Sequence, residues 1–259
     1  MFKFTSRQLS APSGAPGYRA YVVGDVHGRL DLLEALLTKI HADLDERPSR
    51  KTMLVFVGDL IDRGPQSAQV VECLRTYRHP RVRPIFILGN HEEVLLRILG
   101  GDGELIDRWR QFGGTECLES YGVNAGELIG LDDEAQLEIV REAIPKAHVE
   151  FLKSFVDTCR FGDYLFVHAG IRPGIALEQQ LQSDLRWIRA PFLLDGTAHG
   201  FHVVHGHTIT NAVEERPNRI GIDTGAYRSG ILTALAIENG ARWYIDTRAK
   251  VEAEPLATD

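Results

Sequence analysis

Apolar runs of three to six residues recur along the chain, and five of them are followed at once by a short segment rich in Gly, Asp, Asn or His. Short apolar runs bounded by turn residues predict β-strands. The five predicted strands are YRAYVV, MLVFV, PIFIL, YLFV and HVV, at residues 18–23, 53–57, 84–88, 164–167 and 202–204. The polar residues that could carry chemistry therefore lie at strand ends.

Helical patterns follow the first three strands, at residues 32–40, 67–77 and 92–99. This alternation of strand and helix predicts an α/β fold. From about 100 to 144 the chain is polar, acidic and helical in pattern, and we interpret this stretch as a helical insertion beside the active face. After Phe161 the apolar runs are short and separated by Gly, Asn or Pro, which predicts a second sheet, largely antiparallel, that includes ILTALAIE and RWYIDT.

The composition fits a single domain. A length of 259 residues with 44% hydrophobic content suffices for one sizeable core. Residues 1–18 are rich in Ser, Pro, Gly and Ala, so we expect a flexible tail there and one domain at 19–259. A net charge of -7 argues against nucleic acid or an anionic membrane as the main partner. With three scattered cysteines, no secretory signal and no apolar run of membrane length, we expect a cytoplasmic protein without a disulfide scaffold.

The segments after the five strands read GDVHG, GDLIDRG, GNHE, VHAG and GHT, in this order. Each of their polar residues alone has an ordinary explanation as a turn residue, a helix cap or a core histidine. Six potential ligands of the Asp, Asn and His types, all at strand exits, are hard to explain by independent turn preferences. We therefore interpret six residues as metal ligands, namely Asp25, His27, Asp59, Asn90, His168 and His207.

Three oxygen ligands and three imidazoles suit divalent ions such as Mn, Fe or Zn, and they do not suit Ca. A pair of such ions can activate a water and hold the oxygens of a phosphoryl group. We expect two divalent ions, Mn first with Fe or Zn as alternatives, and hydrolysis by direct attack of the activated water without a covalent enzyme intermediate.

Three further residues are tethered to these candidate ligands. Asp62 lies three positions after Asp59, and His91 follows Asn90 directly. A histidine held by a carboxylate through one ring nitrogen can protonate a leaving group with the other, so we assign His91 as general acid, oriented by Asp62. Arg63 follows Asp62, and its planar guanidinium can bind two phosphate oxygens. A second such arginine is expected in DLRWIRAPF, where Arg189 and Arg186 are the candidates.

The five ordered motifs resemble the phosphoprotein phosphatase family within the calcineurin-like metallophosphoesterases, especially its compact bacterial and phage branch. The resemblance runs from about Arg19 to Asp246, and it implies a β-sandwich of two mixed sheets flanked by helices, with a dimetal site at the strand ends. Many metallophosphoesterases carry a further His where this chain has Ile209, so the first ion should have three protein ligands. The implied ligands of that ion are Asp25, His27 and Asp59, and those of the second are Asp59, Asn90, His168 and His207.

The resemblance also bears on the substrate side of the site. The WIRAPF segment resembles a WIR or WNR stretch of the bacterial branch, which favours Arg189 over Arg186. In GIDTGAYRSG we expect Asp223 and Thr224 to be structural and Tyr227 to face the substrate, while a strand followed by a glycine turn explains that segment equally well.

The leading expectation for function is a protein phosphatase that acts on phosphoserine or phosphothreonine in proteins or peptides, with phosphotyrosine and small phosphorylated molecules as further substrates. The alternative is hydrolysis of a dinucleoside polyphosphate by an enzyme of the bis(5'-nucleosyl)-tetraphosphatase type. In the symmetrical tetraphosphatases the corresponding motifs are similar to GDLVARG and GNHD, whereas this chain has GDLIDRG and GNHE. The differing residues, Asp62 and Glu92, favour the phosphatase. A noncatalytic scaffold is a third interpretation, and the intact set of Asp62, Arg63, His91 and metal ligands argues against it.

Overall fold

The computed structural model describes residues 11–249. Within that range the strands are β1 (Tyr18–Val23), β2 (Lys51–Phe56), β3 (Val82–Phe86), β4 (Thr158–Phe161), β5 (Tyr164–Val167), β6 (His202–His205), β7 (Glu214–Glu215), β8 (Arg219–Gly221), β9 (Thr233–Glu238) and β10 (Ala241–Asp246). The α-helices are α1 (Leu30–Asp45), α2 (Ser67–Thr76), α3 (Asn90–Gly100), α4 (Ile106–Trp109), α5 (Thr115–Ser120), α6 (Asp133–Ala143), α7 (Lys146–Lys153), α8 (Gln182–Trp187), α9 (Ala190–Leu193) and α10 (Ala226–Ser229). A π-helical turn, η2, spans Arg110–Gly114, and the 3₁₀ turns are η1 (Gly103–Leu105), η3 (Ala125–Leu128) and η4 (Leu177–Gln179).

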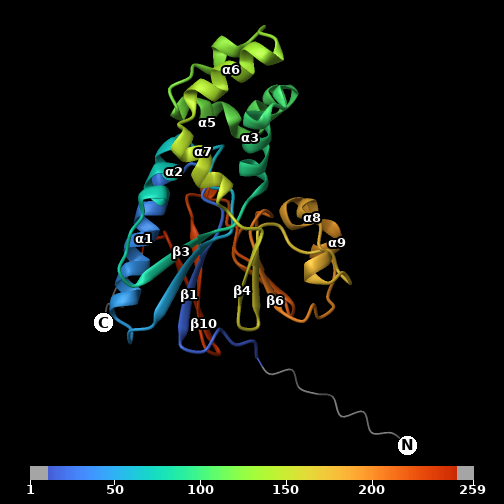
Figure 1. The fold of residues 1–259 in the computed structure, drawn as a ribbon. Coiled ribbons are helices and arrows are strands. Elements are labelled where there is room, and N and C mark those ends of the chain that lie inside the picture. The colour runs from blue at the N-terminus through green and yellow to red at the C-terminus, as the bar shows by residue number, and fades with distance from the viewer. Residues whose placement is uncertain (1–10, 250–259) are drawn as a thin grey trace, which may run out of the picture.

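The strands form two five-stranded mixed sheets that pack on each other, with helices outside them (Figure 1). The first sheet has the order β10-β9-β1-β2-β3, and the second has the order β4-β5-β6-β8-β7. Strands β1, β2 and β3 are parallel, while β9 runs antiparallel to both β1 and β10. This arrangement confirms the predicted α/β sandwich of two mixed sheets.

Alternation along the strands creates the layers, because successive side chains point to opposite faces of a sheet. In β1, Tyr21 and Val23 share a core cluster with the buried face of α1, whereas Ala20 and Val22 lie in the cluster between the sheets. All four side chains are fully buried. The first sheet therefore has one face on helices and the other on the second sheet.

The second sheet follows the same rule. In β5, Phe166 joins the core between the sheets, and Leu165 and Val167 pack outward with Leu185 and Phe192 from the α8 and α9 region. Figure 1 shows α1 and α2 on one side of the sandwich and α8 and α9 on the opposite side. A strand buried on both faces reads as a continuous apolar run, which is why these strands stood out in the sequence.

Two expectations about the second sheet were wrong. The predicted strands ILTALAIE and RWYIDT form β9 and β10, which belong to the first sheet. The second sheet is also not largely antiparallel, since β5 pairs with β6 and β6 with β8 in parallel, and only β4–β5 and β7–β8 are antiparallel. The connection from β5 to β6 contains α8 and α9, so it is a crossover that returns the chain to the same end of the sheet.

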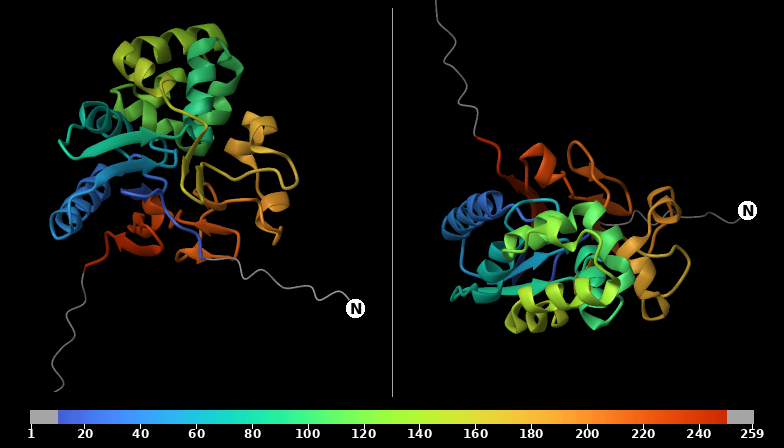
Figure 2. Two further views of the ribbon diagram at one scale, coloured as in Figure 1. Left: turned by 60° about the horizontal axis from the view of Figure 1, so that its bottom comes forward. Right: turned by 90° about the horizontal axis from the view of Figure 1, so that it is seen from above.

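The helical insertion is longer than predicted. Helices continue past residue 144 into α7, so the helical stretch between β3 and β4 runs from α3 to Lys153. These helices gather at one end of the sandwich, at the top of Figure 1, and Figure 2 shows them from two other directions as one group.

Residues 1–10 of the predicted tail lie outside the described residues, and the described part of the tail is not loose. Gly14 donates its backbone N–H to the carbonyl of Asn239, and the backbone N–H of Ser13 donates to the Asp163 carboxylate. The stretch from residue 11 to β1 is thus docked on both sheets. Among residues 11–249 no helix is both long and apolar enough to cross a membrane, and Cys73, Cys117 and Cys159 are free thiols.

Candidate metal centre and active site

The candidate residues lie where strands end and the backbone turns sharply. Six residues other than glycine in the described part have a positive φ, and five of them belong to the predicted site. Such φ values are unfavourable for residues with a side chain and concentrate at functional sites, where the surrounding structure stabilises them. The five residues are His27, Asp59, Asp62, Arg63 and His207, with φ between 46° and 71°.

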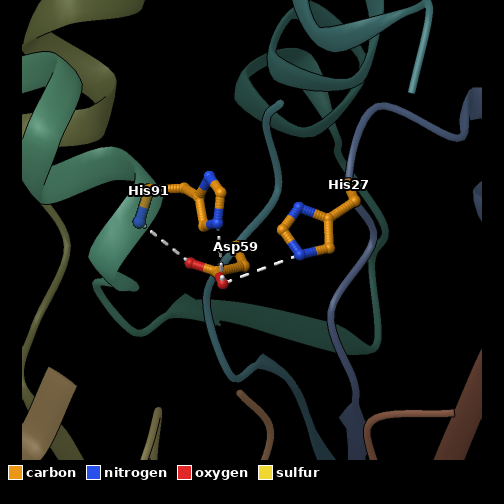
Figure 3. Close-up of side chains that lie close together, drawn as sticks. All are labelled: His27, Asp59 and His91. Atoms are coloured by element: carbon orange, nitrogen blue, oxygen red, sulfur yellow. Dashed lines mark hydrogen bonds and ion pairs between the residues drawn. The ribbon is translucent and has the colours of Figure 1, made fainter. Parts of the chain in front are cut away.

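Asp59 lies at the centre of the site. Its Oδ2 atom is 3.7 Å from His27 Nε2 and 3.9 Å from His91 Nε2. Figure 3 shows the two imidazoles on either side of this carboxylate, one from the loop after β1 and the other from the start of α3. The other oxygen, Oδ1, accepts a hydrogen bond from the backbone N–H of His91 at 3.1 Å. The carboxylate is therefore fixed in a position where it can bridge two ions.

A second group of candidate ligands also includes Asp59. His168 Nε2 is 3.4 Å from Asp59 Oδ2 and 2.9 Å from Asn90 Oδ1, and His207 lies beside His168 with ring centroids 5.0 Å apart. The ligand atoms of Asp59, His168 and His207 all lie within 4.8 Å of one another, as do those of Asp59, His27 and His91. The structure thus brings the predicted ligands into two adjoining groups, and it places His91 near enough to Asp59 to be counted with the first.

Asp25 is the last of the six candidate ligands, and it contacts the loop that carries His207. Its Oδ2 accepts the backbone N–H of His207 at 3.0 Å, which ties the end of β1 to the loop after β6. Its Oδ1 is buried, and so is His207 Nε2, and neither has a hydrogen-bond partner among the described residues. Buried polar atoms without a partner are costly, so a pair of them at a strand-end cluster indicates that something else binds there.

Backbone contacts orient the histidines. His27 Nδ1 lies 2.8 Å from the carbonyl oxygen of Ile61, and His168 Nδ1 lies 2.8 Å from that of Val57. Since a carbonyl can only accept, each Nδ1 carries the proton, and each Nε2 is turned toward Asp59, with the His168 Nε2 also 2.9 Å from Asn90 Oδ1. This is the arrangement in which a protein histidine binds a metal through Nε2.

The electrostatics of the site also fit cations. Burial raises the pKa of Asp25, and the nearby carboxylates of Asp223 and Asp59 raise it further. Burial lowers the pKa of His207 to about 2, and His168 adds to this effect. Buried carboxylates crowded together beside a histidine that burial keeps neutral form a set of electron-pair donors that suits a divalent ion. The residues present therefore fit a pair of metal ions.

His91, Asp62 and Arg63 lie together beside this cluster. His91 Nδ1 is 2.6 Å from Asp62 Oδ2, so that ring nitrogen is held and Nε2 is the free one. Arg63 Nη2 lies 3.2 Å from His91 Nε2. Burial alone would lower the pKa of His91, but the carboxylates of Asp59 and Asp62 outweigh burial and raise it to about 9.

Two residues at the site were not singled out for these contacts in the sequence. The carboxylate of Glu92 accepts backbone N–H groups of Asp59, Leu60 and Gly89 at 2.7–3.1 Å, and it thereby clamps the loop after β2 to the start of α3. The available signal was its place as the third residue of a helix, where Glu completes a capping box. Trp109 of the insertion donates its indole N–H to Asp62 Oδ2 at 2.8 Å, and nothing in the local polar pattern marks it.

The cluster of side chains around Asp59 opens into a recess of about 520 Å³. Its lining includes His91 together with four arginines, and it also has aromatic side chains, of which Phe112 and Trp187 are exposed. The four arginines are Arg63, Arg97, Arg108 and Arg189. A recess of this size and charge suits a small anionic ligand or the phosphorylated part of a larger one.

The two candidate arginines of DLRWIRAPF lie in different environments. Arg189 is exposed in the recess, and its Nη1 reaches Thr208 Oγ1 at 3.5 Å. Arg186 is buried and paired, with Nη2 2.6 Å from Asp157 Oδ1 and Nη1 3.2 Å from Glu93 Oε1. Of the two, Arg189 is thus the one free to bind a ligand.

The segment after β8 borders the cluster. Asp223 is buried and accepts the backbone N–H of Gly225 at 2.9 Å, and the Thr224 hydroxyl donates to the carbonyl of Ile231 at 2.7 Å. Tyr227 packs edge-on against His27, with ring centroids 5.4 Å apart, and the Arg63 guanidinium lies 4.9 Å from the centre of its ring. Tyr227 is therefore a direct neighbour of two candidate site residues.

Comparison with known proteins agrees with this geometry. The profile of the calcineurin-like phosphoesterase family matches residues 18–229. Serine/threonine-protein phosphatase 2 of Escherichia coli is 27% identical over 231 residues, which cover 84% of this chain and 92% of that protein. The asymmetrical bis(5'-nucleosyl)-tetraphosphatase PrpE of Bacillus velezensis is 30% identical over 155 residues, 58% of this chain and 56% of that protein. The solved structure of a protein described as a diadenosine tetraphosphatase has the same fold, with a TM-score of 0.61 at 22% identity over 90% of this chain and 98% of that one.

Proposed function

The chain belongs to the calcineurin-like phosphoesterase family, and from the geometry of its site we propose that it is a dimetal-dependent phosphomonoesterase that removes phosphate from phosphoserine and phosphothreonine in proteins or peptides. The observation that carries the proposal is the hydrogen-bonded pair of Asp62 and His91 beside the metal cluster, with a nitrogen-to-oxygen distance of 2.6 Å.

In this proposal the two groups of residues around Asp59 bind two divalent ions, with Mn as the first candidate and Fe or Zn as alternatives. The first ion would be held by Asp25, His27 and Asp59, and the second by Asp59, Asn90, His168 and His207. The unpartnered Asp25 Oδ1 and His207 Nε2 atoms support this assignment. When bound, the ions would supply an activated water and would neutralise charge on the phosphoryl oxygens.

The remaining residues act on the substrate itself. Arg63 and Arg189 both line the recess, where their guanidinium groups can donate to phosphoryl oxygens and hold the phosphorus in place for attack. Tyr227 contacts Arg63 and His27, which supports a place at the edge of the bound phosphate. Asp62 holds His91 so that Nε2 can deliver a proton to the departing oxygen.

The proton donor is what favours a phosphate ester of an alcohol. A serine or threonine alkoxide is a strongly basic leaving group and departs slowly unless it is protonated, so a positioned acid typically contributes about 10²–10⁴-fold. A nucleotide leaving an anhydride is far less basic and gains little from such an acid. The intact pair of Asp62 and His91 therefore supports phosphomonoester hydrolysis.

A dinucleoside polyphosphate is the second candidate substrate. The recess offers Arg97 and Arg108 in addition to Arg63 and Arg189, and the exposed Phe112 and Trp187 rings could stack on a base. A relative named as an asymmetrical tetraphosphatase, at 30% identity, points in the same direction.

Direct competition between the substrates tests the proposal. The Mn-loaded protein is offered phosphoserine, phosphothreonine and phosphotyrosine peptides and diadenosine tetraphosphate at matched concentrations, with an Asp59→Asn variant as the control for contaminating activity. We expect a higher kcat/KM for the phosphoserine or phosphothreonine peptide than for the dinucleotide. Faster release of nucleotide than of phosphate would replace the protein phosphatase by a polyphosphate hydrolase, and no hydrolysis of any substrate would favour a noncatalytic role.

A further inference from the structure

We propose that Trp109, which comes from the helical insertion, is a positioning residue of the active site: its indole N–H fixes the Asp62 carboxylate that orients His91. The inference rests on the proposed role of His91 as general acid, and it gives the insertion a part in the reaction. The contacts involved are made by Trp109, the last residue of α4, and by Gly113 and Gly114 at the end of η2.

Trp109 reaches Asp62 from the insertion, across the loop after β2. Its Nε1 donates to Asp62 Oδ2 at 2.8 Å, and this is the same oxygen that lies 2.6 Å from His91 Nδ1. Trp109 is 3% exposed and Asp62 is fully buried, so water cannot replace the indole as a donor. The other described hydrogen bonds of Asp62 are made by its backbone: its N–H donates to Ser67 Oγ at 2.9 Å, and its carbonyl accepts the N–H of Gly64 at 2.7 Å.

The shared oxygen explains why the indole matters. A carboxylate can rotate about its bond to Cβ, and a single hydrogen bond to His91 would leave that rotation open. Two donors on Oδ2, from different elements, restrict the carboxylate to one orientation and thereby restrict the imidazole. Groups that act on a reacting atom must be held to within a fraction of an ångström, which supporting hydrogen bonds provide.

The same segment also holds Arg63. The backbone N–H of Arg63 donates to the carbonyl of Gly113 at 3.0 Å, and Gly113 has a φ of 110°, which a residue with a side chain rarely adopts. A Cβ atom on Gly113 would lie 2.5 Å from Arg63 N, and one on Gly114 would overlap the Trp109 indole. These contacts fall in η2, where the backbone at Phe112 and Gly113 departs from helical geometry. The six-residue stretch 109–114 thus contacts both Asp62 and Arg63, which the proposed reaction uses.

Replacement of the indole by a phenyl ring tests the inference, because Trp109→Phe removes the donor and keeps most of the packing. The Mn-loaded variant is assayed with 4-nitrophenyl phosphate, phenyl phosphate and a phosphothreonine peptide, in order of increasing leaving-group basicity. We expect kcat to fall tenfold or more for the peptide and for phenyl phosphate, and less than threefold for 4-nitrophenyl phosphate. KM and metal content should stay unchanged. Trp109→His, which keeps a ring N–H, should recover part of the loss.

Trp243→Phe is the matched control. The Trp243 indole also donates to a carboxylate, Asp43, at 3.3 Å, but it lies on β10 and outside the recess. This variant should leave all three rates unchanged. His91→Ala is assayed in parallel to separate the two ideas. If His91→Ala shows no dependence on the leaving group, the general acid of the proposed function is wrong. If His91→Ala shows that dependence and Trp109→Phe lowers all three rates equally, or none, the positioning role is overturned.

A spectroscopic measurement covers the case in which Trp109→Phe does not fold. In the protein with wild-type Trp109, the indole N–H resonance of Trp109 should show strong protection from hydrogen exchange, and Asp62→Asn should shift that resonance while leaving Trp243 unaffected. A Trp109 resonance that is unprotected, or that does not respond to Asp62→Asn, would overturn the inference.

Discussion

Arg186 and Arg189 are three positions apart and have different partners, so their substitution should have different consequences. Arg186 is 7% exposed and paired with Asp157 and Glu93, whereas Arg189 projects into the recess. We expect Arg186→Ala to lower the free energy of unfolding by about 2 kcal/mol, because it leaves two partly buried carboxylates without their partner. Arg189→Ala should change this free energy by less than about 0.5 kcal/mol, as is usual for exposed residues.

For activity we expect the opposite order, with a larger effect of Arg189→Ala than of Arg186→Ala. Arg189→Ala should lower kcat/KM for 4-nitrophenyl phosphate by roughly tenfold or more, as expected when a charged donor to the transition state is lost. Urea unfolding and steady-state kinetics on both variants measure the two effects. An Arg189→Ala variant with normal kinetics, or one that is as unstable as Arg186→Ala, would contradict the assignment of Arg189 as the second phosphate-binding arginine.

At the scale of single residues, the sequence predicted which side chains gather around Asp59 better than it predicted the contacts that support them. The metal-ligand candidates and His91 were found because strand ends and motif spacing place them, and both are local properties. Trp109 was not found, since its contact with Asp62 joins residues 47 positions apart and no local pattern encodes it. The choice between Arg186 and Arg189 likewise depends on acidic partners in distant segments, Asp157 and Glu93.

At the scale of elements, one side chain, Glu92, joins the loop after β2 to the start of α3. Glu92 accepts the backbone N–H groups of Asp59, Leu60 and Gly89; Asp59 is itself a candidate ligand, and the other two residues are next to one in the chain. In Glu92→Gln one carboxylate oxygen becomes an NH₂ group that faces these donors. We expect a loss of about 1–3 kcal/mol in the free energy of unfolding, from buried N–H groups left without an acceptor.

Metal affinity should fall together with stability in this variant. Because Glu92 supports Asp59, Glu92→Gln should weaken Mn binding by roughly 10–100-fold, the usual effect of changing a residue that supports a metal ligand. Isothermal titration with Mn and thermal unfolding measure the two effects. Glu150→Gln, an exposed change on α7, is the control and should alter neither. Normal Mn affinity in Glu92→Gln would show that the loop after β2 keeps its shape without this clamp.

Elements were easier to predict than their partners. The segment of β9 was recognised as a strand, yet it was assigned to the wrong sheet, because a strand buried on both faces carries no local mark of the strand it pairs with. Ala234 and Ala236 belong to the helix-covered cluster, and Leu235 and Ile237 belong to the core between the sheets. Its register with β1 joins residues more than 200 positions apart, such as Tyr21 and Ala236.

For the whole molecule, the site lies where the two sheets and the insertion meet, so metal binding should stabilise the entire fold. Asp25 and His27 follow β1, Asp59 follows β2, His168 follows β5 and His207 follows β6. Ions shared by these residues would cross-link the two sheets, and any ligand that binds the folded chain alone raises its free energy of unfolding.

The expected size follows from mass action. At a free Mn concentration 100-fold above the dissociation constant, one site contributes about 2.7 kcal/mol. For a chain of this size each kcal/mol corresponds to roughly 2–4 °C, so Tm should rise by about 5–10 °C for one occupied site. Thermal unfolding is recorded after chelation and again after Mn is restored, with metal content measured in each sample. Asp59→Asn, which replaces the carboxylate common to both ligand groups by a neutral amide, should lose most of this rise while it unfolds at a similar temperature without metal. If Mn leaves Tm unchanged and the metal analysis finds none bound, the cluster around Asp59 does not hold ions, because ions bound to both sheets cannot leave their stability unaffected.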